Sequence, residues 1–337
     1  MARKKSRTLQ EELVASYSKH SISSRSTFHP ALWGNGREPA DMIIAVGRSL
    51  LFINATEGKS YFENLCDHNL NQARARILEW QGGRPIRGQN EFQSFAIAWE
   101  DIDHIAVISV VDGPHAACLA HSIITEGMPE KVRICCTITS DVMRDLARLG
   151  GGARDLLAFC KSISEYGVVT AENARSLLSW RYDGRVRWAK AQIPNEPKWL
   201  GATIIKGRPV TWFDEFRVIF EGKRRHGQIP NDFSDLNWDE IFSAVIFITN
   251  SAAEMEASPD GQIRSAIIGH HWRFQVVVSS IIEGLAEYMD GIMERANQAN
   301  CTFTYIVILA SFGISGMIAM NPGLHSWALD AEMAALV

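Results

Sequence analysis

Apolar residues occur in short runs along the first half of the chain, and their spacing predicts alternating strands and helices. The segments 41–46 and 49–56 are rich in Ile, Val, Leu and Phe and are separated by Gly47 and Arg48, which is typical of a β-hairpin. The runs 105–111 and 132–138 are rich in β-branched residues. Such runs favour strands that are buried on both faces of a sheet.

Amphipathic spacing predicts helices around these strands. Thr8 can cap a helix over 9–19, with Glu11 and Glu12 in the first turn, where the helix dipole favours acids. Apolar residues on one face predict a second helix over 64–80. Segment 21–39 is rich in Ser, Gly, Pro and Asn and is expected to be a loop. Further helices are predicted over 115–125, 141–149 and 153–163.

This order of elements predicts an α/β sandwich with helices on both faces of the sheet. We expect a basic tail and first helix over 1–20, an α/β domain over 21–165, a linker over 181–209 and a second α/β domain over 210–337. In this second domain, strands are predicted over 216–220, 244–249 and 303–309, and a helix over 273–295. The topology of the second domain does not follow from the pattern.

The segment 302–320 has no charged residue and is 19 residues long, close to the ~20 residues that span a bilayer. Its β-branched start, Gly313 and Gly316, and the lack of a flanking Lys or Arg on its C-terminal side favour a buried strand followed by a turn. We therefore expect this segment to lie in the protein core and not in a membrane.

Composition places the chain among ordinary globular proteins. The 337 residues are 46% hydrophobic and carry a formal net charge of −4, so any binding of a polyanion must use local basic patches. None of the six cysteines forms a C-x-x-C pair, which indicates reduced, mostly buried thiols of a cytoplasmic protein. The basic N-terminal segment 1–7 has no apolar stretch behind it and does not resemble a secretory signal.

The hairpin carries the strongest candidate chemistry. Asp41 begins one arm, and Glu57 and Lys59 end the other, so the three side chains can meet across an antiparallel ladder. Mg²⁺ prefers one or two carboxylates together with waters and phosphate oxygens. A nearby Lys can orient the attacking water or offset charge on the phosphate. The pattern therefore predicts a Mg²⁺ or Mn²⁺ site that cleaves phosphodiester bonds.

These residues, with Pro39 before Asp41 and Glu57-Gly58-Lys59 after the second strand, resemble the PD-(D/E)xK nucleases, the restriction-endonuclease-like superfamily. The resemblance covers about residues 8–140. It implies an αβββαβ core, with Asp41 and Glu57 holding the metal and Lys59 assisting. It also implies a supporting role for Gln72 on the following helix, and an extra acid from Glu11 or Glu12.

Two other interpretations of the hairpin remain open. A slipped register would put Asn54 and Ala55 at the metal-binding positions and remove the site. The charged hairpin end could also lie in solvent without a metal. The sequence Glu57-Gly58-Lys59-Ser60 resembles the end of a Walker A loop, but position 53 is Ile where that loop needs Gly.

Basic and aromatic residues in the second half suggest a binding role. Lys223, Arg224 and Arg225 form a short basic loop that could contact a phosphate backbone. Seven of the ten Trp lie from Trp180 onward and could stack on bases or anchor an interface.

Two functional hypotheses follow from these patterns. The first is a metal-dependent nuclease of DNA or RNA, for example in DNA repair or anti-phage defence. The second is a non-catalytic subunit with a degenerate nuclease-like domain and a Trp-rich interface to a partner protein or a second copy.

Overall fold

The structure is a computed structural model of the whole chain. It describes residues 8–21, 26–194, 203–205, 208–210, 236–256, 262–269, 273–281, 285–310, 313–320 and 333–334. The predicted strand 216–220 and the basic residues 223–225 lie outside these ranges.

The chain divides into two compact units. The first comprises Met1–Arg181 together with Lys223–Asn237 and Leu329–Val337, and the second comprises Tyr182–Gly222 and Trp238–Ala328. The boundary falls inside the helix α5 (Ala171–Ala191), so the linker expected from residue 181 begins within a helix. Both units are α/β, as the sequence predicts.

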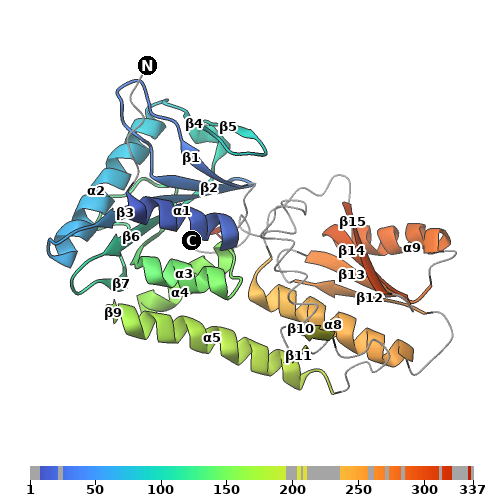
Figure 1. Cartoon of the computed structure of the whole chain (residues 1–337). Helices are drawn as coiled ribbons and strands as arrows, with labels where there is room; N and C mark the ends of the chain where they lie inside the picture. Colours follow the sequence, from blue (N-terminus) through green and yellow to red (C-terminus); the bar gives the residue numbers. More distant parts are fainter. Residues whose placement is uncertain are drawn as a thin grey trace. The chain divides into compact units, whose positions relative to one another are not determined.

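The first unit is built on a mixed sheet with the strand order β5-β4-β1-β2-β3-β6-β8-β7-β9 (Figure 1). Strands β3, β6 and β8 are parallel, and β1, β2 and β3 are joined antiparallel. The strands are β1 (Thr27–Pro30), β2 (Met42–Val46), β3 (Ser49–Glu57), β4 (Ile86–Gln89), β5 (Ser94–Ile97), β6 (His104–Asp112), β7 (Ala117–Ala120), β8 (Val132–Ile138) and β9 (Val169–Thr170).

Helices cover both faces of this sheet. The residue alternation of β8 shows the two sides, because Cys136 contacts Cys160 of α4 while the next residue, Thr137, contacts Cys66 of α2. Helix α2 therefore covers one face, and α1, α3 and α4 cover the other (Figure 1). Besides α5, the helices of this unit are α1 (Leu9–Ser21), α2 (Phe62–Gln81), α3 (Ser140–Arg148) and α4 (Ala153–Tyr166).

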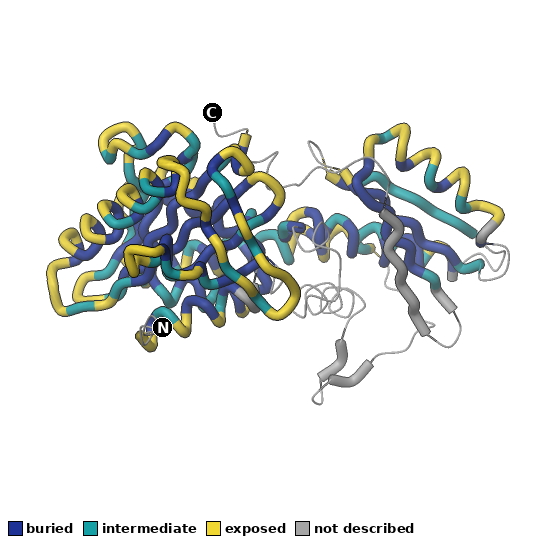
Figure 2. The backbone as a smooth tube through the Cα atoms, turned by 90° about the horizontal axis from the view of Figure 1, so that it is seen from above, coloured by how far each residue is buried: buried dark blue, intermediate teal, exposed yellow. Residues whose placement is uncertain are grey.

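The main core lies between α2 and the sheet. Phe52 of β3 and Ile77 of α2 are fully buried there. The indole of Trp80 is also fully buried, and its Nε1 donates to the carbonyl of Ile97 at 3.1 Å, so the polar tip of this large side chain is satisfied. Figure 2 shows the central strands buried and the outer surfaces of the helices exposed.

The second unit contains a four-stranded sheet with the order β12-β13-β14-β15. Its strands are β12 (Ile263–Ile268), β13 (Arg273–Ser279), β14 (Cys301–Ala310) and β15 (Gly313–Met320). Helix α8 (Trp238–Glu256) contacts β12 and β13, and helix α9 (Leu285–Gln298) contacts β13 and β14. The short strands β10 (Thr203–Ile205) and β11 (Arg208–Val210) form a separate hairpin.

Several predictions made from the pattern are wrong. The segment 115–125 is not a helix but contains β7, and 244–249 is not a strand but part of α8. The segment 273–295, predicted as one helix, contains β13 and the first part of the helix that begins at Leu285. The expected loop 21–39 contains β1, and β4 and β5 were not predicted.

The uncharged segment 302–320 belongs to β14 and β15, which pair antiparallel from Phe303↔Met320 to Ala310↔Gly313. The predicted strand 303–309 is thus confirmed as part of β14. Among the described residues, no helix has the length and apolar character needed to cross a membrane.

Two leucines of α2 offer a matched test of this packing. Leu70 is 2% exposed in the main core, whereas Leu78 on the same helix is 49% exposed. We expect Leu70→Ala to lower the free energy of unfolding by about 2–5 kcal/mol, because it removes buried methyl groups and leaves a cavity. Leu78→Ala should change it by less than about 0.5 kcal/mol. Urea denaturation followed by circular dichroism measures both, and equal losses would contradict this packing.

Candidate functional site

The register of the β2–β3 hairpin decides what Asp41 faces. Met42 pairs with Ile53, so Asp41, the next residue outward, falls opposite Asn54. The Oδ2 atom of Asp41 accepts a hydrogen bond from the backbone N–H of Ala55 at 2.7 Å. The carbonyl of Asp41 lies 2.7 Å from Nδ1 of His29 on β1. The half-buried Asp41 is therefore fastened to the strands on both sides of it.

Glu57 lies on the other side of the sheet from Asn54, because the two are three residues apart on one strand and side chains alternate. It is also about 10 Å further along β3, at ~3.3 Å per residue. The expectation that Asp41 and Glu57 meet across the hairpin is therefore not met. Glu57 is exposed, and its register partner is Asp112 on β6.

The other predicted residues are also dispersed. Lys59 is exposed in the bend after β3, and Gln72 is half-buried on α2. On α1, Glu11 accepts a hydrogen bond from the backbone N–H of Thr8, and Glu12 is exposed. Within the described ranges, no group of three or more His, Cys, Asp or Glu side chains could hold a metal ion.

Asp112 is the centre of a polar cluster at the carboxyl ends of β3 and β6. Its Oδ1 accepts the backbone N–H of Ser140 at 3.0 Å, and its Oδ2 accepts Nε2 of Gln10 at 2.8 Å. The first bond places a carboxylate at the N-terminus of α3, where the helix dipole favours negative charge. The second ties α1 to the sheet, since Nε2 of Gln10 also lies 3.2 Å from the carbonyl of Thr56. Asp112 thus has a structural role.

The loops that leave β3 and β6 approach each other closely beside this cluster. The N–H of Gly58 donates to the carbonyl of Asp112 at 3.2 Å, and a Cβ atom on Gly113 would lie 2.7 Å from the carbonyl oxygen of Gly58. Only glycine fits at position 113. This contact holds Glu57 and Asp112 at one edge of the sheet.

A row of buried polar side chains crosses the three parallel strands on the α2 side. Asn54, Ser109 and Thr137 are register partners on β3, β6 and β8, and each is at most 1% exposed. Neither the side-chain amide of Asn54 nor the hydroxyl of Ser109 has a hydrogen-bond partner in the part of the chain that the structure describes. Buried polar groups of this kind are commonly satisfied by ordered water.

The polar row has little acid–base or nucleophilic capacity. Thr137 is 2.7 Å from Nε2 of His121, and burial lowers the pKa of this imidazole against the opposing charge of Asp67. Burial also raises the pKa of the neighbouring Cys66 thiol to about 11, so the thiol stays protonated at neutral pH. All six cysteines are free and buried, as expected from the sequence.

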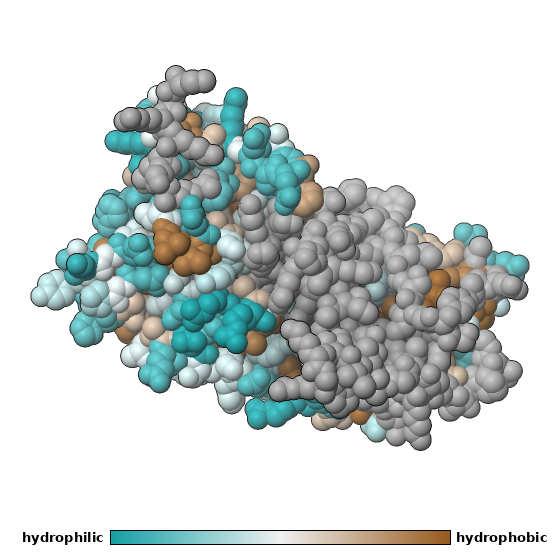
Figure 3. Space-filling model, viewed as in Figure 1, coloured by the Kyte–Doolittle hydropathy of each residue, from teal (hydrophilic) through white to brown (hydrophobic). Residues whose placement is uncertain are grey.

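A groove of about 420 Å³ lies between α3 and α5. Its walls carry an ion-pair cluster in which Arg175 binds Asp145 at 2.7 Å and Arg148 lies 3.6 Å from the same carboxylate. Asp141, Arg144 and Glu172 complete the set, so three acids balance three arginines. The visible face of this unit is largely hydrophilic (Figure 3). Since the charges are balanced, this groove has no strong preference for an anion or a cation.

Comparison of the chain with protein-family models, with curated proteins and with solved structures finds no match.

The roles of Asp112 and Gln10 were not predicted from the sequence. A signal for Asp112 was present, because it ends the apolar run 105–111 and the carboxyl ends of parallel strands meet at one edge. Gln10 gave no signal, since a single Gln in the first turn of an amphipathic helix is ordinary. The polar residues inside apolar runs, Asn54, Ser109 and Thr137, could have marked the buried row.

Gln10 offers a test of the α1–sheet contact. Gln10→Ala removes the donor to Asp112 and Thr56 and leaves these acceptors unsatisfied, so we expect a loss of about 1–3 kcal/mol in the free energy of unfolding. Gln72→Ala, a half-exposed glutamine of α2, is the control and should change the same quantity by less than about 0.5 kcal/mol. Urea denaturation measures both, and a Gln10 variant as stable as the control would contradict the role of this bond.

His121 should make stability depend on pH. Its pKa is lowered in the folded state, so the unfolded chain binds a proton more readily as pH falls through about 6.5. Its contribution to stability is present above that pH and is lost below it. The wild-type protein should lose more unfolding free energy between about pH 7.5 and 5.5 than His121→Gln. Parallel slopes for the two proteins would show that this imidazole is not buried.

Proposed function

We propose that the first unit is a nuclease-like domain that lacks a hydrolytic metal site, and that the chain acts as a non-catalytic subunit that binds other macromolecules. The observation that carries this proposal is the register of the hairpin. Asp41 faces the neutral Asn54 instead of a second carboxylate, and its Oδ2 atom already accepts the Ala55 N–H.

The donor set at this position does not fit a catalytic magnesium ion. In the PD-(D/E)xK pattern, the residue opposite Asp41 and the residue two positions later are an acid and a lysine. Here they are Asn54 and Thr56. The hydroxyl of Thr56 bonds to Asn69 of α2 at 2.5 Å, and Asn54 is buried beneath the same helix. Neither side chain supplies the charge that magnesium or a developing phosphate charge needs.

The order of elements supports the nuclease-like part of the proposal. A helix, three antiparallel strands, a second helix and a parallel fourth strand follow one another as α1, β1, β2, β3, α2 and β6 in sheet order β1-β2-β3-β6. This order is consistent with the αβββαβ core that the resemblance implies. Two short strands, β4 and β5, are inserted between α2 and β6 and extend the sheet at the edge beside β1.

Exposed apolar side chains support a binding role. In the first unit, Trp180 is 66% exposed, Tyr166 is 62% exposed and Val168 is 71% exposed. Large aromatic residues at a surface are typical of protein interfaces, where they supply contact area at a small cost in conformational entropy. The second unit also carries an exposed tryptophan, Trp188.

One observation favours a second candidate function, a metal-dependent nuclease at a different edge. Glu57 and Asp112 are neighbours at the carboxyl ends of parallel strands, and Lys59 follows two residues later. These two carboxylates could hold a divalent ion, although both oxygens of Asp112 already accept hydrogen bonds. Glu57, the exposed acid, would be essential to such a site.

A cleavage assay tests both candidates. Labelled single- and double-stranded DNA and RNA are incubated with Mg²⁺ or Mn²⁺ and the wild type, Asp41→Asn, Glu57→Gln or the control Glu63→Gln, an exposed acid of α2. We expect no metal-dependent cleavage by any of the four proteins, because the hairpin offers one carboxylate instead of two.

Cleavage by the wild type would contradict the non-catalytic proposal, and the variants would locate the site. Loss of cleavage in Asp41→Asn would restore the hairpin as the metal site. Loss in Glu57→Gln alone would establish the second candidate. Retention in Glu63→Gln is required in either case, and circular dichroism shows whether each variant is folded.

A further inference from the structure

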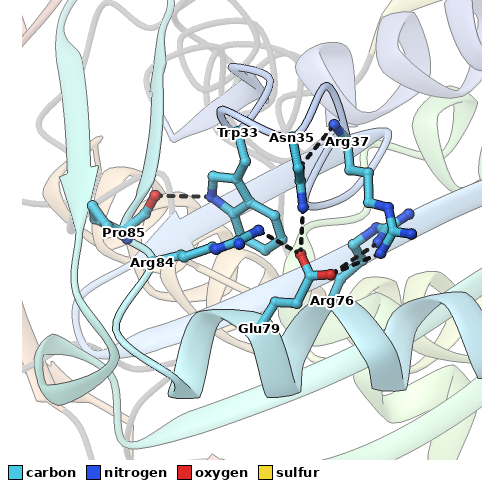
Figure 4. A network of polar contacts seen from close by, with 7 residues as sticks. All are labelled: Trp33, Asn35, Arg37, Arg76, Glu79, Arg84 and Pro85. Atoms are coloured by element: carbon cyan, nitrogen blue, oxygen red, sulfur yellow. Dashed lines mark hydrogen bonds and ion pairs between the residues drawn. The ribbon is translucent and has the colours of Figure 1, made fainter.

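Three arginines converge on one carboxylate at the C-terminal end of α2 (Figure 4). Oε1 of Glu79 lies 2.9 Å from Arg37 and 3.6 Å from Arg76, and Oε2 lies 3.3 Å from Arg84. The side-chain amide of Asn35 also donates to Oε2, at 3.3 Å. Figure 4 shows the guanidinium groups of Arg37 and Arg76 side by side, with Arg84 approaching Glu79 from the opposite side.

The cluster is held in place by the backbone around it. Arg37 lies in a tight turn in which the N–H of Trp33 donates to the carbonyl of Arg37 at 2.8 Å, and Gly36 adopts a φ of 76°. The buried indole of Trp33 donates to the carbonyl of Pro85 at 3.0 Å, which joins this turn to the segment that carries Arg84. Arg76 and Glu79 lie one turn apart on α2. The arginines are therefore presented by three fixed segments.

The carboxylate of Glu79 cannot accept hydrogen bonds from all the N–H donors that surround it. Each guanidinium has five N–H donors, whereas a carboxylate has about four acceptor positions, and Glu79 already receives four groups. Nε of Arg76 is buried and has no hydrogen-bond partner among the described residues. The side chains of Arg37 and Arg84 remain 57% and 49% exposed. Unused donors of Arg37 and Arg84 thus face solvent, whereas the side chain of Arg76 is only 15% exposed and supports the cluster from beneath.

The charge balance separates this cluster from the one between α3 and α5. There, three acids match three arginines, whereas here one acid meets three arginines and leaves two positive charges. Burial tends to raise the pKa of Glu79, but the bonds from Asn35 and Arg37 and the charges of Arg76 and Arg84 outweigh it and lower the pKa. Glu79 therefore remains ionised at neutral pH and orders the arginines.

We propose that Arg37, Arg76 and Arg84 form a binding site for the phosphodiester backbone of a nucleic acid, with Glu79 as the internal counter-ion that orients them. Planar guanidinium groups match phosphate oxygens in bidentate geometry. Arg37 and Arg84 are exposed cations presented by two separate segments, which suits a polymer with repeated phosphates better than a single small anion. Such contacts give affinity without reading the base sequence.

A matched pair of double variants tests the site. Binding of a fluorescein-labelled DNA duplex is measured by fluorescence anisotropy at several salt concentrations. Arg37→Ala/Arg84→Ala removes two arginines of the site. Arg48→Ala/Arg148→Ala removes the same charge from two exposed arginines that form ion pairs elsewhere in the first unit. Thermal melting checks that both variants are folded, and single-stranded DNA and RNA are tested alongside.

We expect the wild type to bind more weakly as salt rises. The site variant should bind about tenfold more weakly for each arginine removed. The slope of log K against log salt should become shallower by about 1.8 for the duplex. The control variant should bind within about twofold of the wild type.

Three results would overturn the proposal: equal binding by the two variants, no binding of DNA or RNA by the wild type at low salt, or binding of poly-glutamate alone. The last would identify an acidic protein as the partner. The inference goes beyond the non-catalytic role and does not depend on it. Cleavage by the wild type would contradict that role but leave this site standing, and loss of backbone binding would leave the role standing.

Discussion

The antiparallel register of β2 and β3 determines which side chains lie beside Asp41, and the proposed function depends on this register. A shift by one residue moves every side chain of a strand to the other face of the sheet, and a buried strand fixes its register through its apolar residues. Leu50 and Phe52 point into the core beneath α2, so Asn54 and Thr56 must point the same way. The apolar half of β3 therefore determines which polar residues meet Asp41.

The same alternation sends Glu57 to the opposite face, where Asp112 is its neighbour. Asp112 binds the N-terminus of α3 and the side chain of Gln10, so this edge joins α1, α3 and the sheet. Polar residues that could have formed a reaction centre instead hold helices in place or lie buried in the row under α2. In the first unit, these polar side chains stabilise a mixed sheet that has helices on both faces.

Much of the first unit could be predicted from the sequence, because its long strands and helices are strongly patterned. The hairpin, β6, β8, α2, α3 and α4 all follow from apolar runs or one-sided spacing. The short strands β1, β4 and β5 could not be predicted, since four-residue strands carry too few residues for a period and form only against a neighbouring strand. Segment 244–249 is a β-branched run inside α8, where packing on β13 outweighs local preference.

The candidate site was harder to predict than the fold. Sequence spacing brings Asp41 near the end of β3, and the two-residue turn at Gly47 and Arg48 already pairs it with Asn54. The expectation that Glu57 lies opposite Asp41 would need an offset three residues longer than this turn allows. The basic cluster at Glu79 involves residues 35, 37, 76, 79 and 84, which come together only when the turn after β1 packs against the end of α2. No local sequence pattern predicts a contact between residues so far apart in the chain.

The most direct test of the central claim is the backbone amide of Ala55. In ¹⁵N-labelled protein, titration with Mn²⁺ broadens the amide signals that lie close to a bound ion. The hydrogen bond to Asp41 and the neutral side chain of Asn54 predict an Ala55 signal that is broadened no more than those of other buried amides. Selective loss of the Ala55 signal at low Mn²⁺, abolished by Asp41→Asn, would place a metal at the hairpin and contradict the account.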